Sequence, residues 1–269
     1  MSKIIKNKTI ICDNKVIKKR NDKLIELYDY LDSRGFNSHP KILDVKEDTI
    51  ESEYINKVNN YELIKGSSFV KTVALLHKNT IEYKDVSKNK YKKIYDKLLG
   101  NINYLKDYYE KMISNIEEEV FMSPSHYLFA RNYSILNNSL KYSRDTLDKW
   151  FKNVENNSKE RVCVVHNNLS LDHFIKGDKD YLISFDKYLV DTPVLDLYKF
   201  YKKEGYKYDF KELLKIYEEE FKLLDSEKEL LFILIAIPPK IIEVEDEYYN
   251  SINIKNNFDY IYSSMVNVN

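Results

Sequence analysis

The hydrophobic pattern of the chain changes once, near residue 56, and this change limits the folds available to it. Four short runs before it are typical of strands: 9–12, 15–19, 42–45 and 49–54. After it, apolar residues recur at intervals of three and four over long stretches such as 91–116 and 132–154. Strands gathered at one end of a chain and helices at the other are typical of an α+β fold.

The first part of the chain is expected to form a small β-rich lobe. Asp13 and Asn14 separate two of its strands and both tolerate a hairpin turn. A helix is expected to follow from Asn21 or Asp22, because its apolar residues share one face, and to stop at Gly35. We therefore expect a small lobe over residues 1–56, with one helix, and a larger helical lobe over 57–269.

Several helices are expected in the second part. Ser67 or Ser68 is expected to cap one of them, and Ser226 with Glu229 forms the pattern of a capping box that opens another. Further helices are expected over these segments: 193–203, 210–224 and 226–237.

The charges and the hydropathy exclude two classes of partner. The 269 residues contain 43 Lys+Arg and 43 Asp+Glu, so the formal net charge is zero and nothing draws the chain to a nucleic acid or to a membrane surface. No apolar run approaches the roughly 20 residues that a membrane-spanning helix needs, so we expect no membrane insertion. The N-terminus carries no run of signal-peptide length, and a cytoplasmic location is expected.

One segment, 162–186, interrupts the helical pattern with polar residues between two strands. An apolar strand over 162–165 leads directly into His166-Asn167-Asn168-Leu169-Ser170-Leu171-Asp172-His173. A second strand, expected over 181–185, carries Ser184 and is followed by Asp186. The functional signal of the chain lies in this segment.

These residues resemble the aminoglycoside phosphotransferase and choline kinase branch of the protein-kinase-like fold, including its spore-coat-associated bacterial members. That family reads His-Gly-Asp-Leu-x-x-x-Asn on its catalytic loop and Ile-Asp-Phe/Trp on the next strand. The positions of this chain that match are His166 for the His, Asn168 for the catalytic Asp, His173 for the metal-binding Asn and Ser184 for the second metal-binding Asp.

The resemblance covers essentially the whole chain and implies a bilobal fold. It also implies that His166 braces the catalytic loop. The family closes with Asp-Pro-x-x-Asp-Leu, which Asp191 and Asp196 match with one extra residue between them. In this scheme Asp196 ties the catalytic loop to the helix beginning near Pro193, and Asp191 caps that helix.

The residues at the matching positions are poorly suited to phosphoryl transfer. Such transfer uses a carboxylate to orient and deprotonate the acceptor, and Mg²⁺ held against the phosphates. The neutral amide of Asn168 has no useful proton affinity near pH 7. Ser184 offers a neutral oxygen where Mg²⁺ favours a carboxylate, and the nitrogen of His173 suits Zn²⁺ better.

The phosphate-binding elements are also altered. No glycine precedes Gly35, so no loop allows the backbone to approach a triphosphate closely. The lysine that pairs with nucleotide phosphates in the family corresponds to Lys18, with Val16 on the same strand face as a roof for the base. Lys19 is the adjacent alternative, and Lys18 could instead be a solvated lysine on an edge strand. Leu24 takes the position of the family's glutamate partner.

A relocated site is a further alternative. Asp186 lies two residues beyond Ser184, on the same face if the strand continues, and Asp172 neighbours His173. Asp172 and Asp186 are therefore the candidate metal ligands if metal binding is retained. A Zn²⁺ site of His166, His173 and Asp186 is a weaker alternative, since its spacing matches no established site.

The sequence thus favours a pseudokinase, a catalytically inactive member of this family that acts as a binding or scaffold protein. Its partner would be an unknown protein, or a small ligand in the cleft between the lobes, and no cofactor is expected. The alternative is an active phosphotransferase on a small hydroxylated substrate, with relocated metal ligands. Only this alternative requires Mg²⁺ and ATP.

Overall fold

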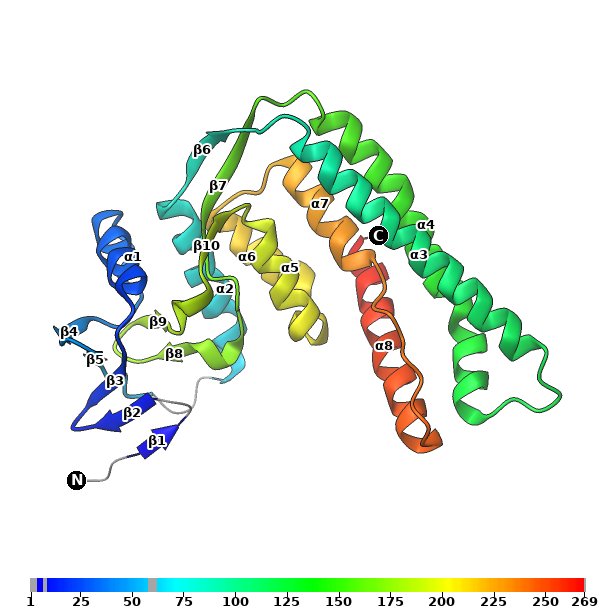
Figure 1. Cartoon of the computed structure of the whole chain (residues 1–269), viewed down its shortest axis with the longest axis horizontal. Helices are drawn as coiled ribbons and strands as arrows, with labels where there is room; N and C mark the ends of the chain where they lie inside the picture. Colours follow the sequence, from blue (N-terminus) through cyan, green and yellow to red (C-terminus); the bar gives the residue numbers. More distant parts are fainter. Residues whose placement is uncertain (1–3, 7–8, 58–61, 269) are drawn as a thin grey trace. The chain divides into compact units, whose positions relative to one another are not determined.

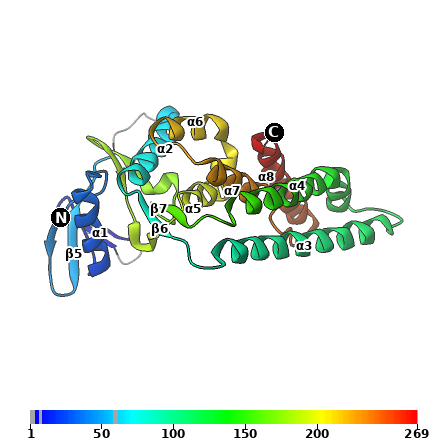
Figure 2. The same cartoon turned by 90° about the horizontal axis from the view of Figure 1, so that it is seen from above.

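The computed structural model describes residues 4–6, 9–57 and 62–268. The chain forms two compact units, each assembled from three segments (Figures 1 and 2). The first unit comprises Met1–Glu82, Arg161–Lys199 and Glu212–Lys222, and the second comprises Tyr83–Glu160, Phe200–Lys211 and Leu223–Asn269. The first unit thus combines the N-terminal sheet with residues 162–186, which we call the catalytic segment. The division into two lobes at residue 56 stays a prediction.

An antiparallel sheet of five strands opens the first unit, as the α+β interpretation requires. Its spatial order is β1 (Ile4–Lys6), β2 (Thr9–Cys12), β3 (Lys15–Lys19), β5 (Thr49–Glu53) and β4 (Ile42–Val45). Asp13 and Asn14 form the β2–β3 turn with φ of 50° and 58°, the left-handed values that a tight hairpin needs. The predicted hairpin is confirmed.

Two helices complete this part of the first unit. Helix α1 (Asp22–Ser33) buries Leu24, Leu27, Tyr28 and Leu31, and Gly35 follows it at φ +76°. Helix α2 spans Glu62–Asn79, so the prediction that Ser67 or Ser68 caps it is wrong. The residues Glu-Leu-Ile-Lys before Gly66 are good helix formers, and they extend the helix past both serines.

The segment of the catalytic motif is built from short strands and turns. Strand β7 (Lys159–Val165) pairs with β10 (Leu189–Asp191), and β8 (Phe174–Lys176) pairs with β9 (Asp180–Leu182). The strand expected over 181–185 therefore ends at Leu182. Two 3₁₀ turns, η1 (Leu171–His173) and η2 (Phe185–Lys187), precede and follow the β8–β9 pair, and helices α5 (Val194–Lys203) and α6 (Phe210–Glu220) come later.

Long helices make up most of the second unit. Helix α4 (Pro124–Val154) packs against α3 (Lys90–Glu117), α7 (Asp225–Ala236) and α8 (Glu247–Val268), as Figure 1 shows. Its core includes Phe129, Trp150 and Phe258. Strand β6 (Glu82–Asp85) and the 3₁₀ turn η3 (Gly205–Lys207) are the remaining elements within the described residues.

Two helix starts in this unit differ from the prediction. Helix α4 begins eight residues earlier than expected, because the Ser123 hydroxyl accepts the N–H of His126 and Pro124 fits the first turn. Helix α7 starts after Leu224, whose N–H donates to the Glu227 carboxylate at 2.9 Å as in one half of a capping box, and the predicted pair of Ser226 and Glu229 is wrong. No helix among the described residues is both long and apolar enough to cross a membrane.

Candidate functional site

A cavity of about 350 Å³ in the first unit gathers three of the sequence-predicted residues. Val16 and Lys18 line it from β3, and Ser184 lines it from the end of the β9 segment. Alternate residues of a strand share a face, so Val16 and Lys18 point into the cavity together. Their partners on β5, Ser52 and Ile50, line it as well.

The walls of this cavity are mainly aliphatic. Ile11 and Ile50 lie on the sheet side with Val16, while Ile175 and Ile183 lie on the side of the catalytic segment. Such a slot suits a flat apolar group, which would bury both of its faces between aliphatic side chains.

Lys18 is the one lysine that lines the cavity among the described residues. It is half-buried on β3, which lies inside the sheet between β2 and β5 and is not an edge strand. No carboxylate of the described residues forms an ion pair with it. From α1, Leu24 and Tyr28 line the cavity and no glutamate does, while Glu53 of β5 lines it from the sheet. The lysine charge is thus available to an anionic ligand.

Asp196 holds the loop that carries the motif. Its fully buried carboxylate accepts the backbone N–H groups of His166 and Asn167, both at 2.7 Å. Asn167 has φ of +61° and stands where the family has glycine, and asparagine is among the residues that tolerate this conformation best. Asp196 belongs to α5, so it joins the loop to that helix, which is the role that the resemblance implies.

The same carboxylate has a partner that the sequence did not predict. His77 of α2 lies with Nε2 at 3.2 Å from Asp196 and with Nδ1 at 2.7 Å from the Tyr217 hydroxyl. Lys199 was missed too, and its ammonium donates to the Asn167 side chain. Asp196 and Lys199 lie three residues apart on one helix face, which is the only sequence signal for this pair.

Both histidines of the motif donate hydrogen bonds to backbone carbonyls. His166 is fully buried and donates from Nε2 to the carbonyl of Ile183 at 2.8 Å. Burial lowers its pKa and keeps it neutral. His173 donates from Nδ1 to the carbonyl of Asn168 at 2.8 Å. Both rings therefore brace the backbone around the motif.

Ser184 breaks the strand that was expected to continue to Asp186. Its φ is +67°, a left-handed value that turns the chain into η2 and ends the strand alternation. Asp186 consequently lies in η2 and is exposed. Burial raises the pKa of Tyr28, and the negative charge of Asp186 raises it further. The premise that Asp186 shares the strand face of Ser184 is wrong.

The candidate metal ligands do not come together at the cavity. Asp172 lies exposed in η1, and neither it nor Asp186 is among the described residues that line the cavity. Over residues 4–6, 9–57 and 62–268, no group of three or more His, Cys, Asp or Glu side chains could hold a metal ion. The donors beside the cavity are therefore a poor fit for Mg²⁺.

Asp191 has a local partner only. Its Oδ1 accepts the N–H of Thr192 at 2.7 Å, and α5 begins at Val194. The carboxylate thus fixes the turn before the helix and does not reach the first helical N–H groups. In chemical terms, the described residues that line the cavity offer one cation (Lys18), one carboxylate on the sheet side (Glu53), several hydroxyls and aliphatic walls, and none of those from the catalytic segment is a carboxylate.

Comparisons with known proteins find relatives by structure alone. No protein-family model and no curated protein sequence matches the chain. An aminoglycoside phosphotransferase from Alicyclobacillus acidocaldarius subsp. acidocaldarius DSM 446 superposes with a TM-score of 0.67 at 10% identity, covering 100% of this chain and 88% of that one.

Two further solved structures are similar. An AMP-bound spectinomycin phosphotransferase has a TM-score of 0.51 at 13% identity, covering 96% of this chain and 89% of that one. A glucosamine kinase has a TM-score of 0.54 at 8% identity, covering 99% of this chain and 75% of that one. These neighbours agree with the resemblance seen in the motifs, and the chain has the protein-kinase-like fold of the aminoglycoside phosphotransferases.

Proposed function

We propose that the protein is a pseudokinase that binds a small anionic ligand in the cavity beside Lys18 and transfers no phosphoryl group. One observation carries this proposal: the cavity keeps an aliphatic slot and a lysine without a counter-ion, while the catalytic segment presents Ser184 to it and no carboxylate. The residues that would hold a ligand are retained, whereas those that would act on it are replaced.

The proposal that the protein binds a small anionic ligand rests on the volume of the cavity and on the charge of Lys18. The cavity volume of about 350 Å³ lies within the range of roughly 300–1,000 Å³ of small-molecule sites. A purine-like ring fits between Val16 and Ile183, and Lys18 would pair with a phosphate of the same ligand. Nothing in this arrangement requires a divalent cation, because the lysine itself supplies the positive charge.

The proposal that the protein transfers no phosphoryl group rests on the missing proton acceptor and on the replaced metal ligands. Asn168 replaces the carboxylate that would accept the proton of the substrate hydroxyl, and a positioned base contributes about 10²–10⁴-fold to a rate. His173 and Ser184 replace the metal ligands, and His173 is already bound to the Asn168 carbonyl. An active phosphotransferase on a small hydroxylated substrate is the second candidate, favoured only by the closeness of Asp186 to Ser184 in sequence.

Calorimetric titration of the purified protein with ATP, ADP and AMP, each with Mg²⁺ or with EDTA, tests the proposal. We expect binding that EDTA does not weaken and that falls about tenfold, roughly 1.4 kcal/mol, in Lys18→Ala. Lys19→Ala is the matched control, because the neighbouring lysine points to the other face of β3 and is exposed.

Two outcomes would count against the proposal. Absence of binding by every nucleotide, with or without metal, would remove the ligand-binding function. Mg²⁺-dependent phosphoryl transfer that Asp186→Asn abolishes would establish the active phosphotransferase instead.

A further inference from the structure

Exposed apolar side chains gather at one end of the second unit. Val120 and Phe121, in the loop between α3 and α4, are 88% and 90% exposed. Four more exposed apolar residues belong to the first turns of α4 and α8 and to the segment before α8: Tyr127, Ile242, Tyr248 and Tyr249. We call these six residues the apolar end. Single exposed apolar residues are ordinary, but a group of this size marks an interaction site.

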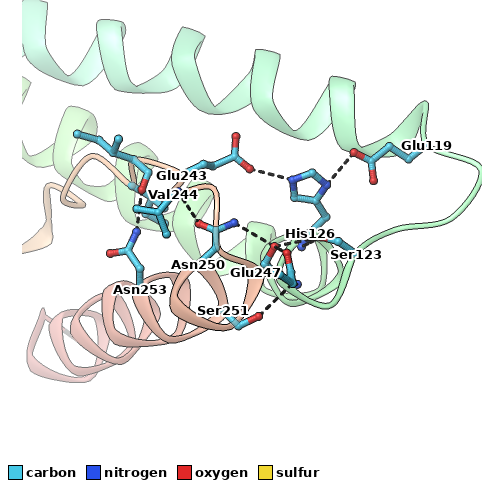
Figure 3. A network of polar contacts seen from close by, with 12 residues as sticks. Glu119, Ser123, His126, Glu243, Val244, Glu247, Asn250, Ser251 and Asn253 are labelled. Atoms are coloured by element: carbon cyan, nitrogen blue, oxygen red, sulfur yellow. Dashed lines mark hydrogen bonds and ion pairs between the residues drawn. The ribbon is translucent and has the colours of Figure 1, made fainter.

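Hydrogen bonds and ion pairs join the distant segments that carry the apolar end (Figure 3). His126 lies with Nδ1 at 2.7 Å from Glu119 and with Nε2 at 2.8 Å from Glu243. Glu247 accepts the backbone N–H and the hydroxyl of Ser125 at 2.6 and 2.8 Å.

Each of these contacts involves a residue that is next to an exposed apolar residue in the sequence. Val120 follows Glu119, Tyr127 follows His126, Ile242 precedes Glu243, and Tyr248 follows Glu247. The loop between α3 and α4, the start of α4 and the start of α8 are therefore fixed against one another, and their apolar side chains stay exposed at this end of the unit.

Carboxylates surround this surface. The acidic residues that flank the apolar end are Glu117, Glu118, Glu119, Glu243, Glu245, Asp246 and Glu247. Glu119 and Glu243 share the charge of His126, whereas Glu118 and Glu245 are exposed and form no ion pair with another described residue. The chain as a whole is neutral, so this end is a local concentration of negative charge.

A hollow of about 490 Å³ adjoins the apolar end. It is lined on the α3 side by Tyr108, Lys111, Met112, Asn115 and Ile116, and it shares Glu119, His126 and Glu243 with the contacts described above. An apolar side chain of a partner could enter it, with the carboxylates at its rim.

We propose that the apolar end docks a basic amphipathic segment of a partner protein. Its apolar side chains would pack on Phe121, Tyr248 and Tyr249, and its lysines or arginines would pair with Glu118 and Glu245. Tyrosine faces also attract these cations. Nucleic acids and anionic membranes carry the same sign of charge as this surface and are repelled by it. The inference is independent of what the Lys18 cavity binds.

A labelled helical peptide made of leucines on one face and lysines on the other tests the docking, by fluorescence anisotropy with the full chain. We expect it to bind at least tenfold more tightly than the same peptide with glutamates in place of the lysines. Phe121→Ser and Tyr249→Ser should each weaken binding about tenfold. Glu118→Lys combined with Glu245→Lys should weaken it further and reduce its salt dependence.

Matched controls come from exposed residues outside the apolar end. Tyr83 is 64% exposed, close to the 65% of Tyr249, and Tyr83→Ser should leave peptide binding unchanged. Asp145→Lys, on the exposed side of α4, is the control for charge reversal.

Three outcomes would overturn the inference. The variants of the apolar end could bind the basic peptide as the native chain does, or the acidic peptide could bind equally well. Self-association of the native chain in sedimentation velocity, abolished by Phe121→Ser, would make a second copy the occupant.

Discussion

His166 and His126 are both hydrogen-bonded histidines near the two proposed binding surfaces, but their surroundings differ. In the first unit, His166 is fully buried and its loop is held by Asp196 through backbone N–H groups. In the second unit, His126 is 24% exposed and is held by two carboxylate side chains. The first network fixes backbone geometry around a neutral ring, whereas the second depends on a charge.

The pKa values of the two histidines shift in opposite directions. Burial lowers the pKa of His166. Burial also disfavours the charge on His126, but the hydrogen bonds of Glu119 and Glu243 outweigh it and raise its pKa. A site built on the first network keeps its geometry across neutral pH, while the second network responds to pH and to salt.

The largest expected effect comes from removing the centre of the buried network. Asp196→Ala leaves the N–H groups of His166 and Asn167 and the ring of His77 without their acceptor. Each buried group that loses its partner costs about 1–3 kcal/mol, so we expect the free energy of unfolding to fall by about 3 kcal/mol or more in urea titrations. Asp191→Ala, which removes one bond to the adjacent residue, should cost much less. Equal losses would contradict the central role of Asp196.

A smaller effect is expected from the exposed network. His126→Gln removes a charge whose folded pKa is raised, so the stability lost is fully present below the unfolded value of about 6.5 and disappears as the pH rises through the folded value. We expect the difference in unfolding free energy between the native chain and the variant to be about 1 kcal/mol at pH 6. It should decrease toward pH 9 and in high salt.

The quantity to measure is the difference in unfolding free energy between the native chain and the His126→Gln variant. Titration of His166 changes the stability of both proteins in the opposite sense, and the difference removes its contribution. Its lowered pKa makes the native state lose stability as the pH falls below about 6.5. The two histidines partly offset each other in the native chain. A difference that is constant from pH 6 to pH 9 would show that the pKa of His126 is the same in the folded and the unfolded protein.

The smallest expected effect concerns Ser184. Its left-handed backbone costs roughly 1–2 kcal/mol for a residue with a side chain, and glycine removes this cost but loses about 0.5–1 kcal/mol through chain entropy. Ser184→Gly should therefore raise the free energy of unfolding by about 0.5 kcal/mol in the same titrations. A loss of stability would mean that the serine side chain makes a contact that stabilises the turn.

Local signals in the sequence were sufficient for much of the fold. The β2–β3 hairpin follows from Asp13-Asn14, and α1 follows from one apolar face ended by Gly35. The match to the family's motifs also pointed to Val16, Lys18 and Ser184, which line one cavity. Val16 and Lys18 share a strand face, and the fold that the chain shares with the family fixes the position of Ser184.

Other features depend on contacts between distant residues and left no local pattern. The partnership of His77 with Asp196 joins α2 to α5 across more than a hundred residues. The end of β9 at Leu182 depends on the backbone of Ser184, whose residue type does not indicate a left-handed conformation. Helix α8 was missed because apolar and polar residues are mixed around its axis.

The discontinuous build of the first unit has a consequence for synthesis on the ribosome. Residues up to Glu82 complete their unit only with the segment that ends at Lys222, which is translated roughly 140 residues later. At about 5–20 residues per second, the delay is roughly 7 to 28 s. During that interval helix α2 lacks β9 and η1, which it contacts in the finished unit, and this makes the nascent chain a candidate client for chaperones that bind exposed hydrophobic surface.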